Sequence, residues 1–200
     1  MNLDEFKRRA GPRVIANKRF NKLFCIGYNK TGTTTLEAVL KAYGYLMPNQ
    51  QEQEARLTQS CFRCDYTELR RFCERFDAFQ DLPFSQGEVY AVADALFPNS
   101  RFVLSERDPD DWFESMTRFH KKMFGLGDLR TLTEQDALTK FTYLFPGYMH
   151  GNQKRLLTEF EGDQPVVRWD RLYDKDFYIA EYLARNRRSA TSRTAWTACW

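Results

Sequence analysis

Long hydrophobic runs are absent from this chain of 200 residues. No stretch approaches the roughly 20 apolar residues that a membrane-spanning helix needs. The opening residues, MNLDEFKRR, carry charges where a secretory leader needs an apolar segment. We therefore expect a soluble, cytoplasmic protein that has no membrane as a partner.

Side chains that bind metals are also scarce. The chain has two histidines, His120 and His150, and neither is spaced as a partner for the cysteine pair Cys61 and Cys64. A structural zinc site usually needs four ligands. The five cysteines are therefore expected to be reduced thiols, with a redox or zinc role for the pair as the weaker alternative, and no metal cofactor is expected.

A large excess of charge of one sign is missing too. The 30 basic and 27 acidic side chains leave a net charge of +3, which is too small to demand a nucleic-acid partner. A local basic site for an anionic small molecule is the better expectation. Hydrophobic residues make up 42% of the chain and aromatic residues 16%, which is enough to bury one sizeable core.

Strand-like and helix-like segments alternate along the chain. The apolar run at residues 23–26 is typical of a buried strand, and the apolar residues after it recur at helical spacing up to a stop at Gly44. Further strands are expected at residues 76–80, 101–105 and 164–169, and further helices at 65–75, 108–123 and 176–184. This order predicts an α/β fold in a single domain, residues 1–200, with a central, largely parallel sheet flanked by helices. Residues 1–21 are expected to form an N-terminal extension, and residues 185–200 a flexible polar tail.

Two of the helices carry capping signals. Asp65 and Glu68 form a capping-box pattern, and Asp108-Pro109 places an N-cap residue before a proline at the first helical position. The face of the second of these helices that packs on the core is expected to carry Trp112, Met116, Phe119 and Met123.

A loop rich in glycine and threonine follows the first strand, in the stretch FCIGYNKTGTTT. Gly27 and Gly32 allow the backbone to wrap closely around a phosphate, and the start of the following helix offers unpaired N–H groups. The hydroxyls of Thr33, Thr34 and Thr35 add donors there. The loop therefore predicts a phosphate cradle at the carboxyl end of the strand.

The position of the lysine separates this loop from that of the nucleotide triphosphatases. In those proteins the lysine follows the second glycine and precedes the Ser or Thr that binds magnesium. Here Thr33 holds that place, and Lys30 lies inside the loop. A transferred sulfuryl group carries one negative charge where a terminal phosphoryl group carries about two, so a lysine and backbone donors could stabilise its transfer without a metal. The altered order favours sulfuryl transfer.

A second charged motif, ERDPDDWFES, also follows a strand and opens a helix. Arg107 lies at the end of the strand, and Ser115 comes eight residues later. An arginine fork and a helix hydroxyl can together hold a phosphate. The alternative is that Arg107 pairs with Asp108 or Asp110 and that Ser115 lies on a solvated face.

Together the two motifs resemble the PAPS-dependent sulfotransferase family, whose donor is 3′-phosphoadenosine 5′-phosphosulfate (PAPS). The stretch KTGTT, residues 30–34, resembles the 5′-phosphosulfate loop of that family, and RDP followed by Ser115 resembles its 3′-phosphate motif. The resemblance covers residues 23–116 well and the rest of the chain thinly. It implies a P-loop-NTPase-like fold, PAPS as the co-substrate and 3′,5′-ADP as the product.

The resemblance also implies roles for individual residues. Lys30 would contact the bridging oxygen of the phosphosulfate and stabilise the leaving group, while Arg107 and Ser115 would hold the 3′-phosphate. The 5′-phosphosulfate would be held by the loop residues Lys30, Thr31, Gly32, Thr33, Thr34 and Thr35.

The base that takes the proton of the acceptor has two candidates. Asp81-Leu82-Pro83 lies where cytosolic relatives carry His-Leu-Pro with a catalytic histidine. Asp81 could act as the base if partial burial raises its pKa, and its alternative role is that of a turn residue before Pro83. His150 lies in a region that also resembles the small sulfotransferases, and its alternative role is that of a surface histidine.

One element of the cytosolic relatives is not found in the sequence. Their Arg-Lys-Gly loop completes the 3′-phosphate site, and Arg185, Arg187 and Arg188 are the candidates to replace it. Aromatic residues within 119–160 are expected to cover the acceptor site or to belong to the core.

The sequence thus predicts a sulfotransferase that moves a sulfuryl group from PAPS to a hydroxyl or amine of a small-molecule or glycan acceptor by direct in-line transfer. The alternatives are a nucleotide or small-molecule kinase with a degenerate P-loop, or a non-catalytic relative that binds 3′,5′-ADP. The sequence leaves the acceptor and the oligomeric state open.

Overall fold

The computed structural model describes residues 18–191 and 195–199, the latter by their backbone only. The described chain falls into two compact units. The first comprises the residues up to Arg107 together with those from Ala184 onward, and the second runs from Asp108 to Leu183. The single domain stays a prediction, as does the N-terminal extension, of which residues 1–17 lie outside the described part.

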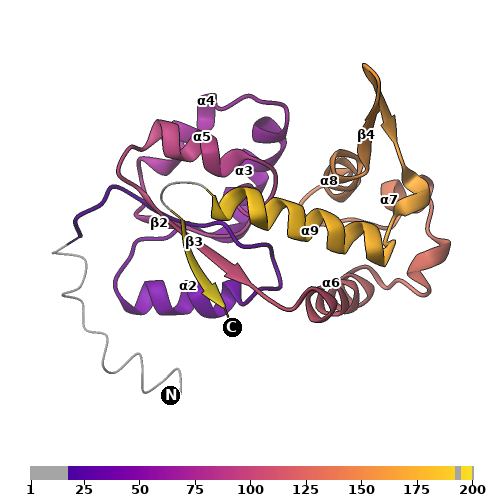
Figure 1. The fold of residues 1–200 in the computed structure, drawn as a ribbon, viewed down its shortest axis with the longest axis horizontal. Coiled ribbons are helices and arrows are strands. Elements are labelled where there is room, and N and C mark those ends of the chain that lie inside the picture. Colours follow the sequence, from indigo (N-terminus) through magenta and orange to yellow (C-terminus); the bar gives the residue numbers. More distant parts are fainter. Residues whose placement is uncertain (1–17, 192–194, 200) are drawn as a thin grey trace. The chain divides into compact units, whose positions relative to one another are not determined.

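A parallel sheet forms the centre of the first unit (Figure 1). Its strands follow the order β2-β1-β3-β6, and every neighbouring pair is parallel. The strands are β1 (Leu23–Cys25), β2 (Ala78–Phe79), β3 (Arg101–Glu106) and β6 (Ala195–Cys199). The predicted α/β fold with a central parallel sheet is therefore confirmed.

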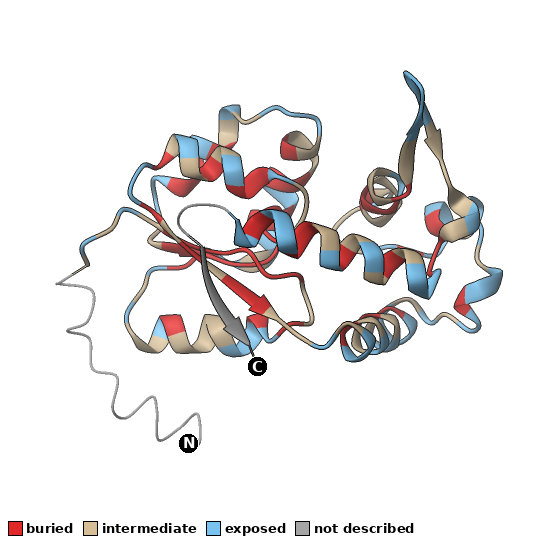
Figure 2. Ribbon diagram, in the orientation of Figure 1, coloured by how far each residue is buried: buried red, intermediate tan, exposed pale blue. Residues whose placement is uncertain are grey.

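Helices cover both faces of this sheet: α2 lies on one face, and α3, α4 and α5 lie on the other (Figure 1). They are α2 (Thr33–Ala42), α3 (Gln50–Phe62), α4 (Thr67–Cys73) and α5 (Val89–Leu96). Successive side chains of a strand point to opposite faces. Phe24 accordingly packs among residues of α3, α4 and α5, whereas Leu23 and Cys25 pack with Leu40 of α2. β1 and β2 are buried throughout, whereas β3 contains both buried and intermediate residues, red and tan in Figure 2.

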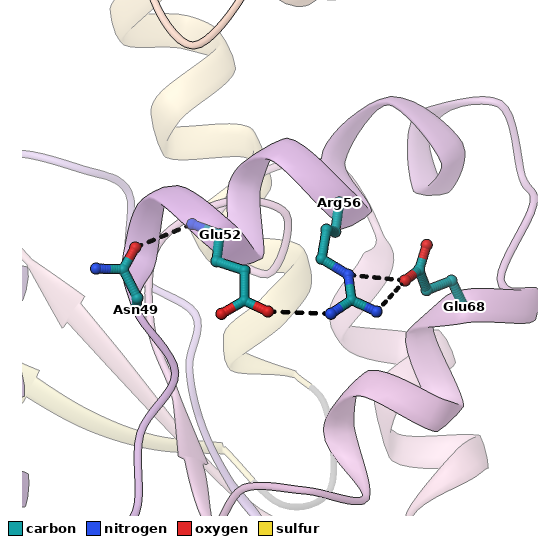
Figure 3. Close-up of polar contacts among 4 residues, drawn as sticks. All are labelled: Asn49, Glu52, Arg56 and Glu68. Atoms are coloured by element: carbon teal, nitrogen blue, oxygen red, sulfur yellow. Dashed lines mark hydrogen bonds and ion pairs between the residues drawn. The ribbon is translucent and has the colours of Figure 1, made fainter.

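Polar contacts join α3 to α4 on the surface of the first unit (Figure 3). Asn49 caps α3, because its side-chain oxygen accepts a hydrogen bond of 3.0 Å from the backbone N–H of Glu52. Arg56, one turn further along, lies 3.0 Å from the carboxylate of Glu52 and also donates to Glu68 of α4. Exposed ion pairs of this kind stabilise a fold only weakly.

The predicted capping box at the start of α4 is wrong. Asp65 does accept a hydrogen bond of 3.0 Å from the backbone N–H of Thr67, but α4 begins at Thr67 with Tyr66 as its N-cap. Glu68 does not complete the box, because the backbone N–H of Asp65 donates instead to the carbonyl of Ser60 at 2.9 Å.

The strand predicted at residues 164–169 exists but does not belong to the central sheet. It is β5 (Gln164–Val167), which pairs with β4 (Thr158–Glu161) as an antiparallel hairpin in the second unit. Gly162, with φ of 62°, begins the tight turn between the two strands. The half of β5 nearest the turn is exposed, which does not suit a central parallel strand. The fourth strand of the central sheet is β6 instead, within the segment that was expected to be a tail.

The second unit contains the long helix α6 and several shorter elements. Its helices are α6 (Pro109–Phe124), α7 (Glu134–Thr139), α8 (Tyr148–Leu156), the first part of α9 (Lys175–Ala190), and the 3₁₀ turns η2 (Leu129–Thr131) and η3 (Trp169–Arg171). The helix predicted at residues 176–184 therefore continues to Ala190.

The start of α6 agrees with the sequence. Asp108 is the N-cap, and its carboxylate accepts hydrogen bonds from the N–H groups of Asp110 and Asp111, at 3.0 and 3.2 Å. The predicted buried face is only partly right. The fully buried positions are Trp112, Met116 and His120, which are four residues apart, whereas Met123 is exposed.

Gly27 marks a close approach between two strands of the first unit. It follows the last bond of β1 to β3, in which the N–H of Ile26 donates to the carbonyl of Val103 at 2.8 Å. A Cβ atom at Gly27 would lie 2.2 Å from the Ser105 hydroxyl oxygen and 2.4 Å from the Ser105 carbonyl oxygen. Only a glycine lets the backbone pass β3 at this distance.

We expect Gly27→Ala to lower the melting temperature by about 2–12 °C, since overpacking costs about 1–3 kcal/mol in a chain of this size. Thermal unfolding followed by circular dichroism measures the change. Gly127→Ala is the matched control, because a Cβ atom there would meet nothing within 4 Å. Equal melting temperatures for Gly27→Ala and the unaltered chain would contradict the contact.

Candidate active site

The glycine loop, residues 27–35, connects β1 to α2 at the carboxyl end of the strand. Lys30 and Gly32 adopt positive φ angles of 70° and 92°, and Gly32 is the N-cap of α2. This N-cap has no side chain to bond the first N–H groups, and the first turn carries no acidic residue. Thr33 is buried, while Thr34 and Thr35 are exposed. A helix start of this kind suits an anion, because its N–H groups carry partial positive charge.

The hydroxyl of Thr31 is used inside the protein. It donates to the carbonyl of Tyr28 at 2.5 Å and lies 2.8 Å from the Ser105 hydroxyl of β3. Thr31 is only 2% exposed. The side chain of this predicted donor-binding residue therefore holds the shape of the loop, and it fastens the loop to the neighbouring strand.

Asp81 lies just beyond β2, which pairs with β1 in the same sheet. Its carboxylate is buried and accepts three hydrogen bonds: 3.0 Å from the backbone N–H of Leu82, 3.5 Å from the Ser85 hydroxyl and 3.1 Å from the Gln50 amide. Like Lys30, Asp81 has a positive φ angle, 61°. Non-glycine residues in this conformation are uncommon and gather at functional sites.

Burial raises the pKa of Asp81 to about 6. The hydrogen bonds from Leu82 and Ser85 and the positive charge of Lys30 lower the pKa, and the negative charge of Glu37 raises it, but burial dominates. The structure thus places Lys30 and Asp81 within electrostatic reach of each other. A carboxylate with a pKa near 6 is ionised at neutral pH and can accept a proton.

Glutamine side chains surround Asp81, and the sequence did not single them out. The Gln80 amide lies between Glu37 and Gln50, at 3.3 and 3.2 Å, and Gln53 donates to the carbonyls on either side of Asp81, those of Gln80 and Leu82, at 2.7 and 2.6 Å. Gln50 and Gln53 come from α3, a helix absent from the predicted elements. The Asn49-to-Glu52 capping pattern was the signal that could have found it.

Arg107 and Ser115 belong to different units, and each is half-buried. Arg107 follows β3 directly, and Ser115 lies in α6. Asp108 and Asp110, the carboxylates considered as partners of Arg107, make contacts within the second unit: Asp108 caps α6, and Asp110 lies 2.5 Å from the Lys175 ammonium group. Binding of the 3′-phosphate by Arg107 and Ser115 stays a prediction.

His150, the second candidate base, lies in α8 of the second unit. Its ring stacks on Trp169 with the ring centroids 5.1 Å apart, and its Nε2 atom lies 3.1 Å from the Glu134 carboxylate. The structure therefore brings His150 together with an indole ring and a carboxylate.

The arginines near the C-terminus differ in their surroundings. Arg185 is buried, and its guanidinium donates to the carbonyls of Ile26 and Phe84. Arg188 is exposed and lies 3.0 Å from the carboxylate of Glu88. The guanidinium of Arg185 is thus engaged inside the first unit, which does not favour the predicted contact with a 3′-phosphate.

The two cysteines of the pair lie in different surroundings, and both are free thiols. Cys61 is buried, and burial raises the pKa of its thiol to about 12, whereas Cys64 is exposed. Within the described ranges, His, Cys, Asp and Glu side chains do not form a group of three that could hold a metal ion. In the same residues no helix is long and apolar enough to span a membrane.

Comparison with known proteins bears on the resemblance to sulfotransferases. No curated protein matches the chain. A family model described as a sulfotransferase domain matches residues 22–187, a range that includes the glycine loop, Asp81, Arg107, Ser115 and His150. Because the match extends over most of the 200 residues, the chain belongs to the sulfotransferase domain family.

Proposed function

We propose that this sulfotransferase moves a sulfuryl group from PAPS to a hydroxyl or amine of a small-molecule or glycan acceptor by direct in-line transfer. The observation that carries the proposal is the electrostatic interaction between the Lys30 charge and the buried carboxylate of Asp81, which lowers the pKa of that carboxylate. A cation and a proton acceptor are the two groups that such a transfer requires of the protein.

The glycine loop fits the donor. PAPS, when bound, supplies an activated sulfuryl group joined to a phosphate through a bridging oxygen. The uncapped N-terminus of α2 and the hydroxyls of Thr33, Thr34 and Thr35 would hold the 5′-phosphosulfate. Lys30 would lie at the bridging oxygen, where negative charge develops as the bond to sulfur breaks.

Asp81 is the base in this proposal. The acceptor oxygen or nitrogen forms a bond to sulfur, its proton passes to the Asp81 carboxylate, and the bridging oxygen leaves with 3′,5′-ADP. Gln50 fixes the carboxylate through its bond to one oxygen, and Leu82 and Ser85 bond to the other. The absence of a metal from the reaction stays a prediction.

Donor recognition is tested by ligand-dependent thermal stability. We expect 3′,5′-ADP to raise the melting temperature, and 5′-AMP or ATP with magnesium to do so much less, because a ligand that binds only the folded state stabilises it. Arg107→Ala should weaken this effect. Stabilisation by ATP with magnesium that exceeds stabilisation by 3′,5′-ADP would favour a kinase and contradict the proposal.

Replacing the lysine of the glycine loop tests its role at the leaving group. Lys30→Ala should lower kcat by about 10²–10³, the effect of losing one electrostatic donor in a transition state. Sulfate transfer from radiolabelled PAPS measures the rate. Lys122→Ala, a change at an exposed position of α6, is the control and should retain full activity. Turnover by Lys30→Ala within threefold of the unaltered enzyme would remove Lys30 from the reaction.

The pH dependence of kcat tests the base. Because Asp81 must be ionised to accept a proton, activity should fall as the pH drops through about 6. Asp81→Asn should lower kcat by about 10²–10⁴ and abolish this acid limb. Asp81→Asn should still be stabilised by 3′,5′-ADP, which separates loss of the base from loss of the donor site.

His150→Gln decides between the two candidate bases. With Asp81 as the base, His150→Gln should have an unchanged kcat, and its activity should still fall as the pH drops through about 6. A loss of activity in His150→Gln together with normal activity in Asp81→Asn would assign the base to His150. Binding of 3′,5′-ADP without transfer of sulfate to any acceptor would instead indicate a non-catalytic relative.

A further inference from the structure

Arg185 is a buried arginine that contacts both functional loops of the first unit. It lies near the end of α9 and is 1% exposed. Its Nη1 group donates to the carbonyl of Ile26, the residue before Gly27. Its Nη2 group donates to the carbonyl of Phe84 at 2.9 Å, in the loop that carries Asp81. One side chain therefore joins the glycine loop to the loop of the candidate base.

Two aromatic rings lie close to this guanidinium. Its Cζ atom lies 5.5 Å from the ring centroid of Tyr28, which belongs to the glycine loop, and 5.3 Å from that of Tyr90 in α5. Ile26 and Phe84 are fully buried, so little water is at hand to replace the guanidinium at their carbonyls. The loss of Arg185 would leave two buried acceptors without these donors.

Joining the two loops through Arg185 costs free energy, because a charged side chain has to be buried. Burial lowers the pKa of its guanidinium. Within residues 18–191, no carboxylate forms an ion pair with it. A buried cation whose direct partners are carbonyls and rings is costly even with the favourable charge of Glu88 nearby, and a neutral packing residue would avoid that cost. The cost has a reason if the two carbonyls must be held at a set distance and angle. A planar guanidinium can hold two acceptors in a fixed geometry, and an ammonium group cannot.

We propose that Arg185 is a positioning residue that holds the glycine loop and the Asp81 loop in register, and so sets the distance between Lys30 and Asp81. That Arg185 joins the two loops does not depend on which reaction the protein catalyses. That this joining matters for catalysis rests on the proposed function. Positioning of this kind matters because small displacements of reacting groups cost large factors in rate.

Hydrogen–deuterium exchange tests the link without any assay of activity. In Arg185→Lys, segments 26–32 and 81–86 should both exchange faster, by about tenfold or more, the effect of losing a hydrogen bond from a charged donor. Segments in α3 and α4 should exchange as before. Arg188→Lys, on the exposed face of the same helix, is the matched control and should change neither loop. Faster exchange in one loop alone, or in neither, overturns the proposal.

The acid limb of kcat gives a second readout that a purely structural role would not move. Lys30 lowers the pKa of Asp81, so separating the two raises the pH at which activity is lost in Arg185→Lys. We expect kcat to fall at least about tenfold, while the affinity for 3′,5′-ADP changes by less than about threefold. An unchanged acid limb and kcat would overturn the catalytic part of the proposal.

The two proposals fail in different ways. If the unaltered chain neither binds 3′,5′-ADP nor transfers sulfate, the proposed function is wrong, and the exchange experiment still decides whether Arg185 joins the loops. If Arg185→Lys does not fold, Tyr90→Leu takes its place, because it removes one ring from the guanidinium and keeps both carbonyl bonds. Tyr90→Leu should speed exchange in both loops by a smaller factor. Unchanged exchange in that variant overturns the proposal.

Discussion

The parallel pairing of β1 with β2 and β3 is the constraint on which the candidate site depends. Phe24 of β1 lies opposite Phe79 of β2 and Phe102 of β3, so the three strands run in one direction and in register. Their carboxyl ends therefore meet at one edge of the sheet, and each is followed by a predicted site residue. Lys30, Asp81 and Arg107 are distant in the sequence, but they lie at the same edge because the loops that follow parallel strands all begin there.

The aromatic core offsets the cost of burying a charge at this edge. A rise in pKa from 3.8 to about 6 means that the ionised form of Asp81 costs about 3 kcal/mol at neutral pH. The ring of Phe84, three residues further on, packs 5.0 Å from Phe24 and 5.4 Å from Phe79. Burying one phenylalanine contributes about 1.5–3 kcal/mol, which is comparable to that cost. The loop can therefore hold a buried carboxylate because its neighbouring ring is part of the core.

Local patterns predicted the parts of the site that are local. The glycine loop and the helix start at Asp108 each depend on a few adjacent residues, and the sequence was sufficient to find them. Asp81 was singled out through the resemblance to the His-Leu-Pro of cytosolic sulfotransferases. Gln50, Ser105 and Arg185 reach the site through tertiary packing, which no spacing reveals. β5 was taken for a strand of the main sheet, and β6 for part of a tail, because the sheet to which a short strand belongs depends on its partners more than on its own residues.

The pKa of Asp81 offers a physical reason for the position of Lys30 inside the glycine loop. A carboxylate base beside a polyanionic donor is repelled by it, and this repulsion would raise the pKa of Asp81 further and strengthen it as a base. Without a nearby cation, the same repulsion would leave the base protonated at neutral pH. Lys30 opposes that rise and, in the proposed reaction, also faces the leaving oxygen. A lysine placed after the second glycine would belong to α2, whereas one inside the loop, at a positive φ angle, is free of the helix geometry and can serve both groups.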